Sequence, residues 1–421
     1  MRKVILVFLF ISIFLNFARA EEITLNLEEA VAIALRDNPS ILLKTEELKK
    51  AKEILAQSYA AVFPNLNLTG GWQRTSGFYN KNISSTNTQI NLQQSLYQGG
   101  RIINTISINK DRIELSQTIL DKTKLEIVSA VKRAFYTLML SKKLIELNQR
   151  ILENMQAHLE VIKKRYQYGE TSRNDILNLE TSLVSAQKAY EEALNQQEQA
   201  QAILRDLLFL DEGVIIKPVE EFFYEEKEII YDKAFLEALS KRPEIRQYEL
   251  EESIAKRNVE LMRAENRPKI FTFWNYSSNS RATTVMGSNK GWQDYQNLGI
   301  TVNWPVFDGW LTSHKVKEAL IELKEVQILK GKIKKDIALE LKKAYLSLKN
   351  AIAKLKKAES EIIFYKDNFL TLEEKYKKGE ISLLDKEDAE LKYKIALFNK
   401  EEAIYDYLVA KVDFDRATGG M

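Results

Sequence analysis

Residues 101–169 read RIINTISINKDRIELSQTILDKTKLEIVSAVKRAFYTLMLSKKLIELNQRILENMQAHLEVIKKRYQYG, a run without proline in which glycine occurs only at the last position. Apolar residues recur along it every seven positions, at Val131, Leu138, Ile145, Leu152, Leu159 and Tyr166. A seven-residue apolar repeat is typical of a coiled-coil seam. At 1.5 Å per residue, such a helix spans roughly 100 Å. The sequence therefore predicts one very long helix over about residues 101–167.

The same seam occurs a second time, at residue numbers higher by 210. It reads Leu341, Leu348, Leu355, Ile362, Phe369 and Tyr376. We therefore predict a duplicated chain, with a first structural repeat over residues 21–208 and a second over 232–421, joined by a connecting segment at 209–231. The second long helix is predicted at about 310–377. After the glycines that end the two long helices, returning helices are predicted at about 173–208 and 383–410.

Each repeat also contains a stretch in which apolar and polar residues alternate. In the first, Ile90 and Leu92 alternate with Gln89, Asn91 and Gln93. In the second, Ile300 and Val302 alternate with polar residues that include Asn303. Alternation predicts a β-strand with one apolar and one polar face. We predict one β-hairpin per repeat, at about 65–97 and 269–307, with polar loops at about 75–86 and 278–294.

The tryptophans cluster at these hairpins. All five lie in or beside them: Trp72, Trp274, Trp292, Trp304 and Trp310. They could form the core of a β-cap. The alternating polar face instead favours the aromatic girdle of an outer-membrane barrel, formed by Trp72, Trp274 and Trp304, with Gln89, Asn91, Gln93 and Asn303 lining the lumen. Four strands cannot close a barrel; two chains give eight with a filled interior, and three give twelve around an open lumen.

The N-terminal residues predict export. Arg2 and Lys3 precede an apolar run at 4–17 and a small-residue site at 18–20, which is the pattern of a signal peptide cleaved before Glu21. The run could alternatively be a single membrane anchor, but it is shorter than the roughly 17–25 residues that a spanning helix needs.

Composition excludes several classes of site. The chain has no cysteine, which excludes disulfides, zinc–thiolate sites and a cysteine-linked N-terminal lipid. Its two histidines cannot form a histidine metal cluster. The +3 charge falls to zero without the signal peptide, so no nucleic-acid partner is predicted. No catalytic constellation or nucleotide loop is present, so we predict neither an enzyme nor a cofactor.

Together these features resemble the TolC family of outer-membrane efflux proteins. The most specific motifs are Leu27-Glu-Glu-Ala with Asn38-Pro39, Tyr97-Gln98-Gly99-Gly100, and a Tyr-x-x-Gly-x-x-Ser-x-x-Asp pattern at Tyr166, Gly169, Ser172 and Asp175 that returns at Tyr376, Gly379, Ser382 and Asp385. The resemblance implies a mainly helical homotrimer in which a twelve-stranded outer-membrane β-barrel continues as a periplasmic α-helical barrel. It implies a passive exit duct of a tripartite efflux or type I secretion system.

The resemblance also implies roles for the helical tips. A periplasmic adaptor, or membrane fusion protein, and an inner-membrane pump or ABC exporter would join the duct at the turns formed by Tyr166, Gly169, Ser172, Tyr376, Gly379 and Ser382. Family members constrict there with acidic rings, and Asp385 and Asp388 occupy the matching positions, with Asp175 in the first repeat. A position where some relatives carry a closing arginine is Ile381 here.

Two alternatives remain open at the sequence level. Ser172 with Asp175, and Ser382 with Asp385, also form the pattern of a helix capping box. The chain could be a periplasmic coiled-coil adaptor or scaffold that forms no pore, although no glycine- and valine-rich lipoyl-like module is found. A lumen of Asn, Gln and Ser is unselective, so drugs, metal ions and unfolded toxins are all conceivable cargo.

Overall fold

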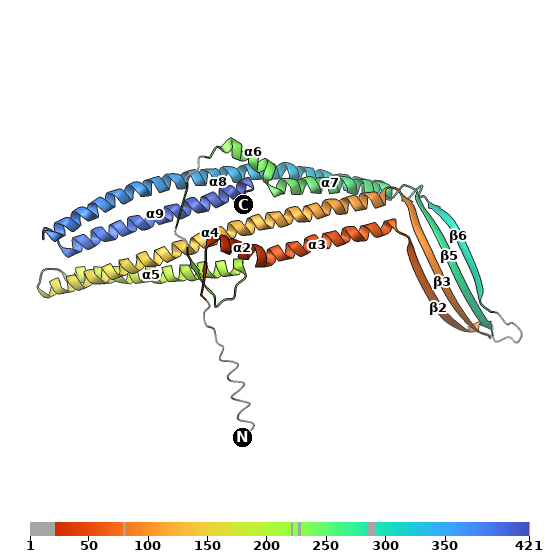
Figure 1. Ribbon diagram of the computed structural model, residues 1–421, viewed down its shortest axis with the longest axis horizontal. Coiled ribbons are helices and arrows are strands. Elements are labelled where there is room, and N and C mark those ends of the chain that lie inside the picture. Colours follow the sequence, from red (N-terminus) through yellow and green to blue (C-terminus); the bar gives the residue numbers. More distant parts are fainter. Residues whose placement is uncertain (1–21, 79–80, 220–221, 226–228, 284–290, 421) are drawn as a thin grey trace, which may run out of the picture. The chain divides into compact units, whose positions relative to one another are not determined.

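The computed structural model describes residues 22–78, 81–219, 222–225, 229–283 and 291–420 (Figure 1). The predicted signal peptide lies outside these residues. The chain forms two compact units. One, the tip unit, comprises Met1–Leu43, Asp121–Pro243 and Lys334–Met421, and the other, the sheet unit, comprises Lys44–Leu120 and Glu244–Ile333. Among the described helices, none is both long and apolar enough to span a membrane.

Two 67-residue helices dominate the chain, α4 (Arg101–Gln167) and α8 (Leu311–Lys377). Each leads through a turn into a 36-residue helix, α5 (Arg173–Leu208) or α9 (Leu383–Thr418). The predicted end of the last helix at residue 410 is too early. Val412, Phe414 and Ala417 are still buried, and the helix ends only at the left-handed Gly419, where φ is +80°.

Shorter helices come in pairs, one pair per repeat: α2 (Leu27–Asp37) with α3 (Pro39–Tyr59), and α6 (Tyr231–Lys241) with α7 (Pro243–Ala264). Pro39 and Pro243 occupy the first positions of α3 and α7, where a missing N–H costs nothing. Asn26 caps α2 in a reciprocal capping box with Glu29. The short 3₁₀ helix η1 (Ala60–Val62) follows α3.

The core of the first repeat lies in the tip unit. It is formed by α2, α4, α5 and a parallel strand pair, β1 (Glu22–Leu25) with β4 (Ile215–Pro218). Phe135 of α4, Leu204 of α5 and Ile216 of β4 are almost fully buried there. Strand β4 lies inside the connecting segment, where the sequence pattern predicted no strand. Its local signal is only a short apolar run around Ile216.

The sheet unit contains one four-stranded antiparallel sheet of order β2-β3-β5-β6. Its strands are β2 (Asn65–Phe78), β3 (Lys81–Gln98), β5 (Lys269–Thr283) and β6 (Gln293–Asn303). The β3–β5 pairing joins the hairpins of the two repeats. Strands β2 and β3 occupy most of the loop predicted at 75–86, because backbone hydrogen bonds continue through these polar residues whatever their side chains. Strands β5 and β6 extend into the two ends of the loop predicted at 278–294, and residues 284–290 of that loop lie outside the described residues.

Candidate functional site

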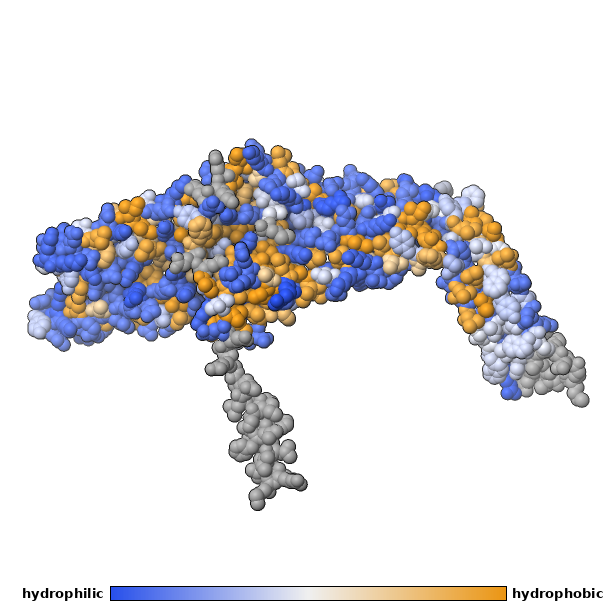
Figure 2. Space-filling view, in the orientation of Figure 1, coloured by the Kyte–Doolittle hydropathy of each residue, from blue (hydrophilic) through white to orange (hydrophobic). Residues whose placement is uncertain are grey.

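One face of the sheet is apolar and exposed. Directly paired residues lie on the same face of an antiparallel sheet. One such row runs Leu66, Leu92, Trp274, Leu298 across the four strands. Leu66 is 65% exposed and Leu298 is 74% exposed. Figure 2 shows apolar surface over these strands. We call this the apolar face. An exposed apolar surface of this kind marks a site that contacts a membrane or another protein.

The opposite face is polar. Its central row consists of four asparagines, Asn67, Asn91, Asn275 and Asn297. The register places all four predicted lumen residues on this polar face: Gln89, Asn91, Gln93 and Asn303. That this face lines a lumen stays a prediction. The polar face also carries Phe273, whose ring lies against Gly299. A Cβ added to Gly299 would be only 2.8 Å from Phe273 Cζ. The alternation of polar residues did not indicate an aromatic ring on this face.

Both edges of the sheet are open within the described residues. Strand β2 pairs only with β3, and β6 pairs only with β5. Each edge also carries apolar side chains that are more than half exposed, such as Leu68 on β2 and Ile300 on β6. Unpaired backbone groups beside an apolar face cannot be left in lipid. In lipid, both edges would therefore need further strands as partners.

Two of the predicted girdle residues, Trp72 and Trp304, lie toward opposite ends of the sheet, whereas Trp274 lies between them in the row of Leu92 and Leu298 and not at an end. Trp72 is 68% exposed on the apolar face, in the row that contains Ser280 of β5. Trp304 directly follows β6 at the Lys269 end, and its Nε1 donates to the Asn266 carbonyl at 3.2 Å. Ser280, in the row of Trp72, and Lys269, at the end near Trp304, are eleven residues apart in β5, which is roughly 36 Å along the strand. Strands tilted by about 40° would make this roughly 27 Å along a barrel axis, close to the ~25 Å apolar band of outer-membrane barrels.

The two helical tips are built alike. Gly169 and Gly379 both have φ of +77°, with no atom near a hypothetical Cβ. Gly169 N donates to Tyr166 O at 3.0 Å, and Gly379 N donates to Tyr376 O at 2.9 Å. In the next position of each turn, Glu170 N donates to Arg165 O and Glu380 N donates to Lys375 O. This is a left-handed glycine cap, which explains why both long helices stop at this motif.

The predicted acidic residues Asp175 and Asp385 form capping boxes. Asp175 Oδ2 accepts from Ser172 N at 2.9 Å and from Ser172 Oγ at 2.7 Å. Asp385 Oδ2 accepts from Ser382 N at 3.1 Å and Oγ at 2.7 Å. The bonds from Ser172 and from Ser382 hold the pKa of each carboxyl below its usual range. Both carboxyls therefore stay charged until the pH falls below the ordinary carboxyl range. The capping role exists, and both side chains remain exposed.

Asp388 has a partner that the sequence did not indicate. Its Oδ1 lies 3.3 Å from Nε2 of His158 on α4. The only local signal was that His158 is one of two histidines in the chain and precedes a seam leucine.

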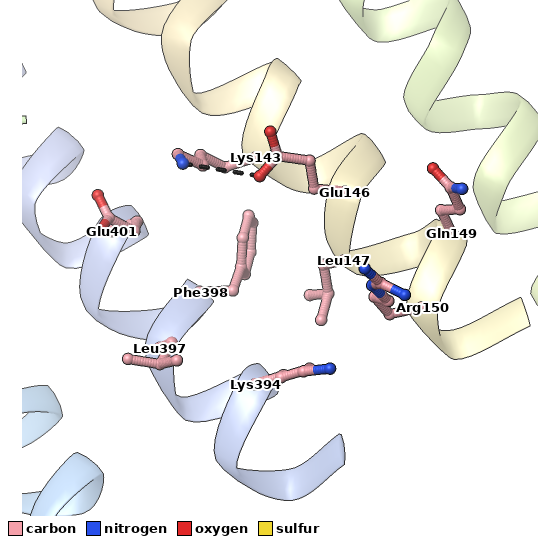
Figure 3. Close-up of a pocket in the computed structure, with 9 residues that line it drawn as sticks. All are labelled: Lys143, Glu146, Leu147, Gln149, Arg150, Lys394, Leu397, Phe398 and Glu401. Carbon is pink, nitrogen blue, oxygen red and sulfur yellow. Dashed lines mark ion pairs between the residues drawn. The ribbon is translucent and has the colours of Figure 1, made fainter. Parts of the chain in front are cut away.

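Helices α4 and α9 lie side by side. Further from the tip than His158, a hollow of about 450 Å³ between them is lined by Leu147, Leu397 and Phe398 with charged neighbours (Figure 3). The described residues include no cluster of three or more potential His, Cys, Asp or Glu metal ligands.

The sequence matches the family described as outer membrane efflux protein over residues 30–208 and 235–420. The chain belongs to the outer membrane efflux protein family. The two matched segments correspond to the two repeats, and the predicted resemblance is confirmed. This outer membrane efflux protein has the mainly helical fold with a β-sheet portion that the motifs predicted, and its homologues are efflux channels rather than enzymes.

Solved structures of outer membrane proteins share the fold of this outer membrane efflux protein. The Campylobacter jejuni CmeC outer membrane channel aligns with a TM-score of 0.77 at 18% identity, over 94% of this chain and 86% of that one. The open state of the Neisseria gonorrhoeae MtrE outer membrane channel aligns at 0.75 and 18%, over 94% and 89%. The Vibrio cholerae outer membrane protein VceC aligns at 0.74 and 15%, over 94% and 96%. No curated protein sequence matches the chain significantly.

Proposed function

We propose that three copies of this chain form a passive exit duct, in which a twelve-stranded outer-membrane β-barrel continues as a periplasmic α-helical barrel. The observation that carries the proposal is the four-stranded sheet with one exposed apolar face, one polar face and two open edges. Three such sheets joined edge to edge satisfy both edges. Twelve strands also leave a lumen for the polar face, whereas eight are filled by side chains.

The duct would receive cargo at its periplasmic tips. A periplasmic adaptor and an inner-membrane pump or ABC exporter would join it at the turns around Gly169 and Gly379, as part of a tripartite efflux or type I secretion system. The pump supplies the energy, since the sequence contains no nucleotide-binding loop. The signal peptide at 1–20 would export the chain across the inner membrane, and the chain would then reach the outer membrane without a cysteine-linked lipid, since the sequence has no cysteine. The amide-rich polar face does not favour one cargo class.

The mass and conductance of the purified protein test this proposal. In detergent, native mass spectrometry is expected to give a trimer, and planar bilayers are expected to show ion-conducting steps. A water-soluble monomer without conductance would contradict the duct and favour the adaptor or scaffold alternative. The full chain should be expressed with its own signal region, so that export and processing are tested in the same experiment.

The proposed aperture leads to a second prediction, which concerns how its acidic residues affect conductance. Asp385 and Asp388 lie three residues apart, on one face of α9. Three chains would bring six such carboxylates together, a constriction that favours cations. Replacing both by alanine (Asp385→Ala with Asp388→Ala) is expected to raise single-channel conductance several-fold and reduce the preference for K⁺ over Cl⁻. Glu192→Ala, which removes an exposed carboxylate paired with Lys188 on α5, is the control. Unchanged conductance and selectivity in the double variant would exclude an acidic aperture at these positions.

A further inference from the structure

The two repeats contact each other along α4 and α9 in the tip unit, where the helices run antiparallel (Figure 1). Arg133 of α4 forms an ion pair with Asp413 of α9. Thr137 Oγ1 lies 3.1 Å from Tyr405 Oη. Closer to the tips, His158 meets Asp388. The His158 contact lies within three turns of the end of α4, so it is the contact among these that lies beside the proposed aperture.

His158 is buried, and the Asp388 carboxylate is the ion-pair partner that the described structure gives it. Its side chain is 10% exposed, and Nε2 forms no directed hydrogen bond within the described structure. The atom 3.3 Å away is a carboxylate oxygen, which can only accept. In neutral imidazole, the tautomer with its lone pair on Nε2 is repelled there, and the Nε2–H tautomer has no hydrogen-bond partner in this geometry. A protonated imidazole adds a full positive charge and forms an ion pair. Protonation of His158 therefore strengthens this contact, and deprotonation weakens it.

Asp388 faces both His158 and solvent. Its side chain is 48% exposed, so the carboxylate is not enclosed by the contact. It follows the capping residue Asp385 by three positions, which places both on one face of α9. The charge that the pair presents to solvent is that of a free carboxylate when His158 is neutral. It is close to zero when His158 is protonated.

Several other charges of this region form ion pairs with one another. On α4, Arg150 pairs with Glu153 at 2.8 Å, and Lys163 lies 4.0 Å from Glu180 of α5. On α9, Lys386 and Lys394 both pair with Glu390, and on α8, Lys377 pairs with Glu373. Glu387 of α9 lines a smaller hollow between α4 and α9, beside Arg150 and Lys394. After the bonds from Ser382, the charge of Arg165 is the further influence that holds the pKa of Asp385 low.

We propose that His158 controls the cation preference of the aperture. In acid, the protonated His158 side chain neutralises the charge of Asp388, and the duct then prefers cations less strongly. The inference rests on the proposed function of the tips as an aperture. In a trimer, protonation of three imidazoles would remove half of the charge contributed by Asp385 and Asp388. It would also tie α4 to α9, and so the first repeat to the second, at the tips.

Reversal potentials in a KCl gradient test this at pH 5.5 and pH 8.0, which bracket the range where imidazoles titrate while carboxylates stay ionised. The purified full-length trimer is placed in neutral phosphatidylcholine bilayers. We expect the wild-type K⁺/Cl⁻ permeability ratio to be at least about twofold lower at pH 5.5. In His158→Gln the ratio should be the same at both pH values. His314→Gln is the matched control, because the chain has only these two histidines, and it should behave as wild type.

Two results overturn the proposal in a conducting trimer: a wild-type ratio that does not change with pH, or a His158→Gln variant that keeps the change. A thermodynamic cycle tests the contact independently of conductance. Thermal unfolding of wild type, His158→Gln, Asp388→Asn and the double variant should show a coupling between the two residues that is larger at pH 5.5 than at pH 8.0. No coupling at either pH overturns the proposal, whereas a monomer or a non-conducting protein contradicts the proposed function instead.

Discussion

Leu298→Arg is expected to abolish assembly in the outer membrane, whereas Asn297→Arg is expected to leave it intact. The two residues are neighbours in β6, but Leu298 lies on the apolar face with Leu66, Leu92 and Trp274, and Asn297 lies on the polar face. An arginine on the lipid side of a barrel costs about 2–4 kcal/mol near the bilayer centre. Three chains would each bear this cost, so few trimers should form.

The measurement is the amount of heat-stable trimer in outer-membrane fractions. The variants are matched, since they place the same side chain at adjacent positions of one strand. Any general effect of arginine on strand formation or on export is therefore shared. Equal loss in both variants would show that the strand, not the face, is sensitive. Normal assembly of Leu298→Arg would mean that the apolar face does not meet lipid.

Glu340→Ala is expected to destabilise the folded chain by roughly 2–3 kcal/mol. The Glu340 carboxylate binds two guanidinium groups, with Oε2 2.8 Å from Arg242 Nη2 and Oε1 2.8 Å from Arg416 Nη2. The Arg242 side chain is only 6% exposed. Removing one partner from a fully buried pair costs about 3–5 kcal/mol. Glu340 is a third exposed and Arg416 two fifths exposed, so water screens part of this loss.

Thermal unfolding in detergent, followed by circular dichroism, measures this effect. Glu340→Gln keeps the shape and an acceptor oxygen and should recover part of the stability. Glu192→Ala is the control, because an exposed i,i+4 pair is worth only about 0.3–0.5 kcal/mol. A Glu340→Ala melting temperature no lower than that of the control would show that the two arginines find sufficient solvation without the carboxylate.

The duplicated pattern explains why so much of the helical architecture could be predicted. Seven-residue apolar spacing and glycines at the tips are local signals, and each occurs twice. The same duplication places Asn38 and Arg242 at equivalent positions. Asn38 Nδ2 donates to Leu207 O at 2.9 Å, and Arg242 Nη1 donates to Ala417 O at 3.4 Å. The fold of one repeat therefore predicts that of the other.

Contacts between distant segments left no such signal. Nothing in the alternation of β3 and β5 indicates that these two strands pair with each other, and the polar ends of the strands resembled loops. The His158–Asp388 contact joins residues from different repeats, and no local sequence motif indicates it. Glu340 replaces an alanine of the first repeat, Ala130, so the second repeat carries a charged cluster that the duplication could not predict.

The parallel pair of β1 and β4 sets an order of events during biosynthesis. Glu22 and Lys217, which form an ion pair between these strands, are 195 residues apart. Since ribosomes make the N-terminal end first, β1 has no strand to pair with until β4 has been made. The buried cluster around Phe135 and Ile216 can then close in one late step. Contacts of such high sequence separation form slowly. The first-repeat part of the tip unit thus closes as a single cooperative piece, not helix by helix as it emerges.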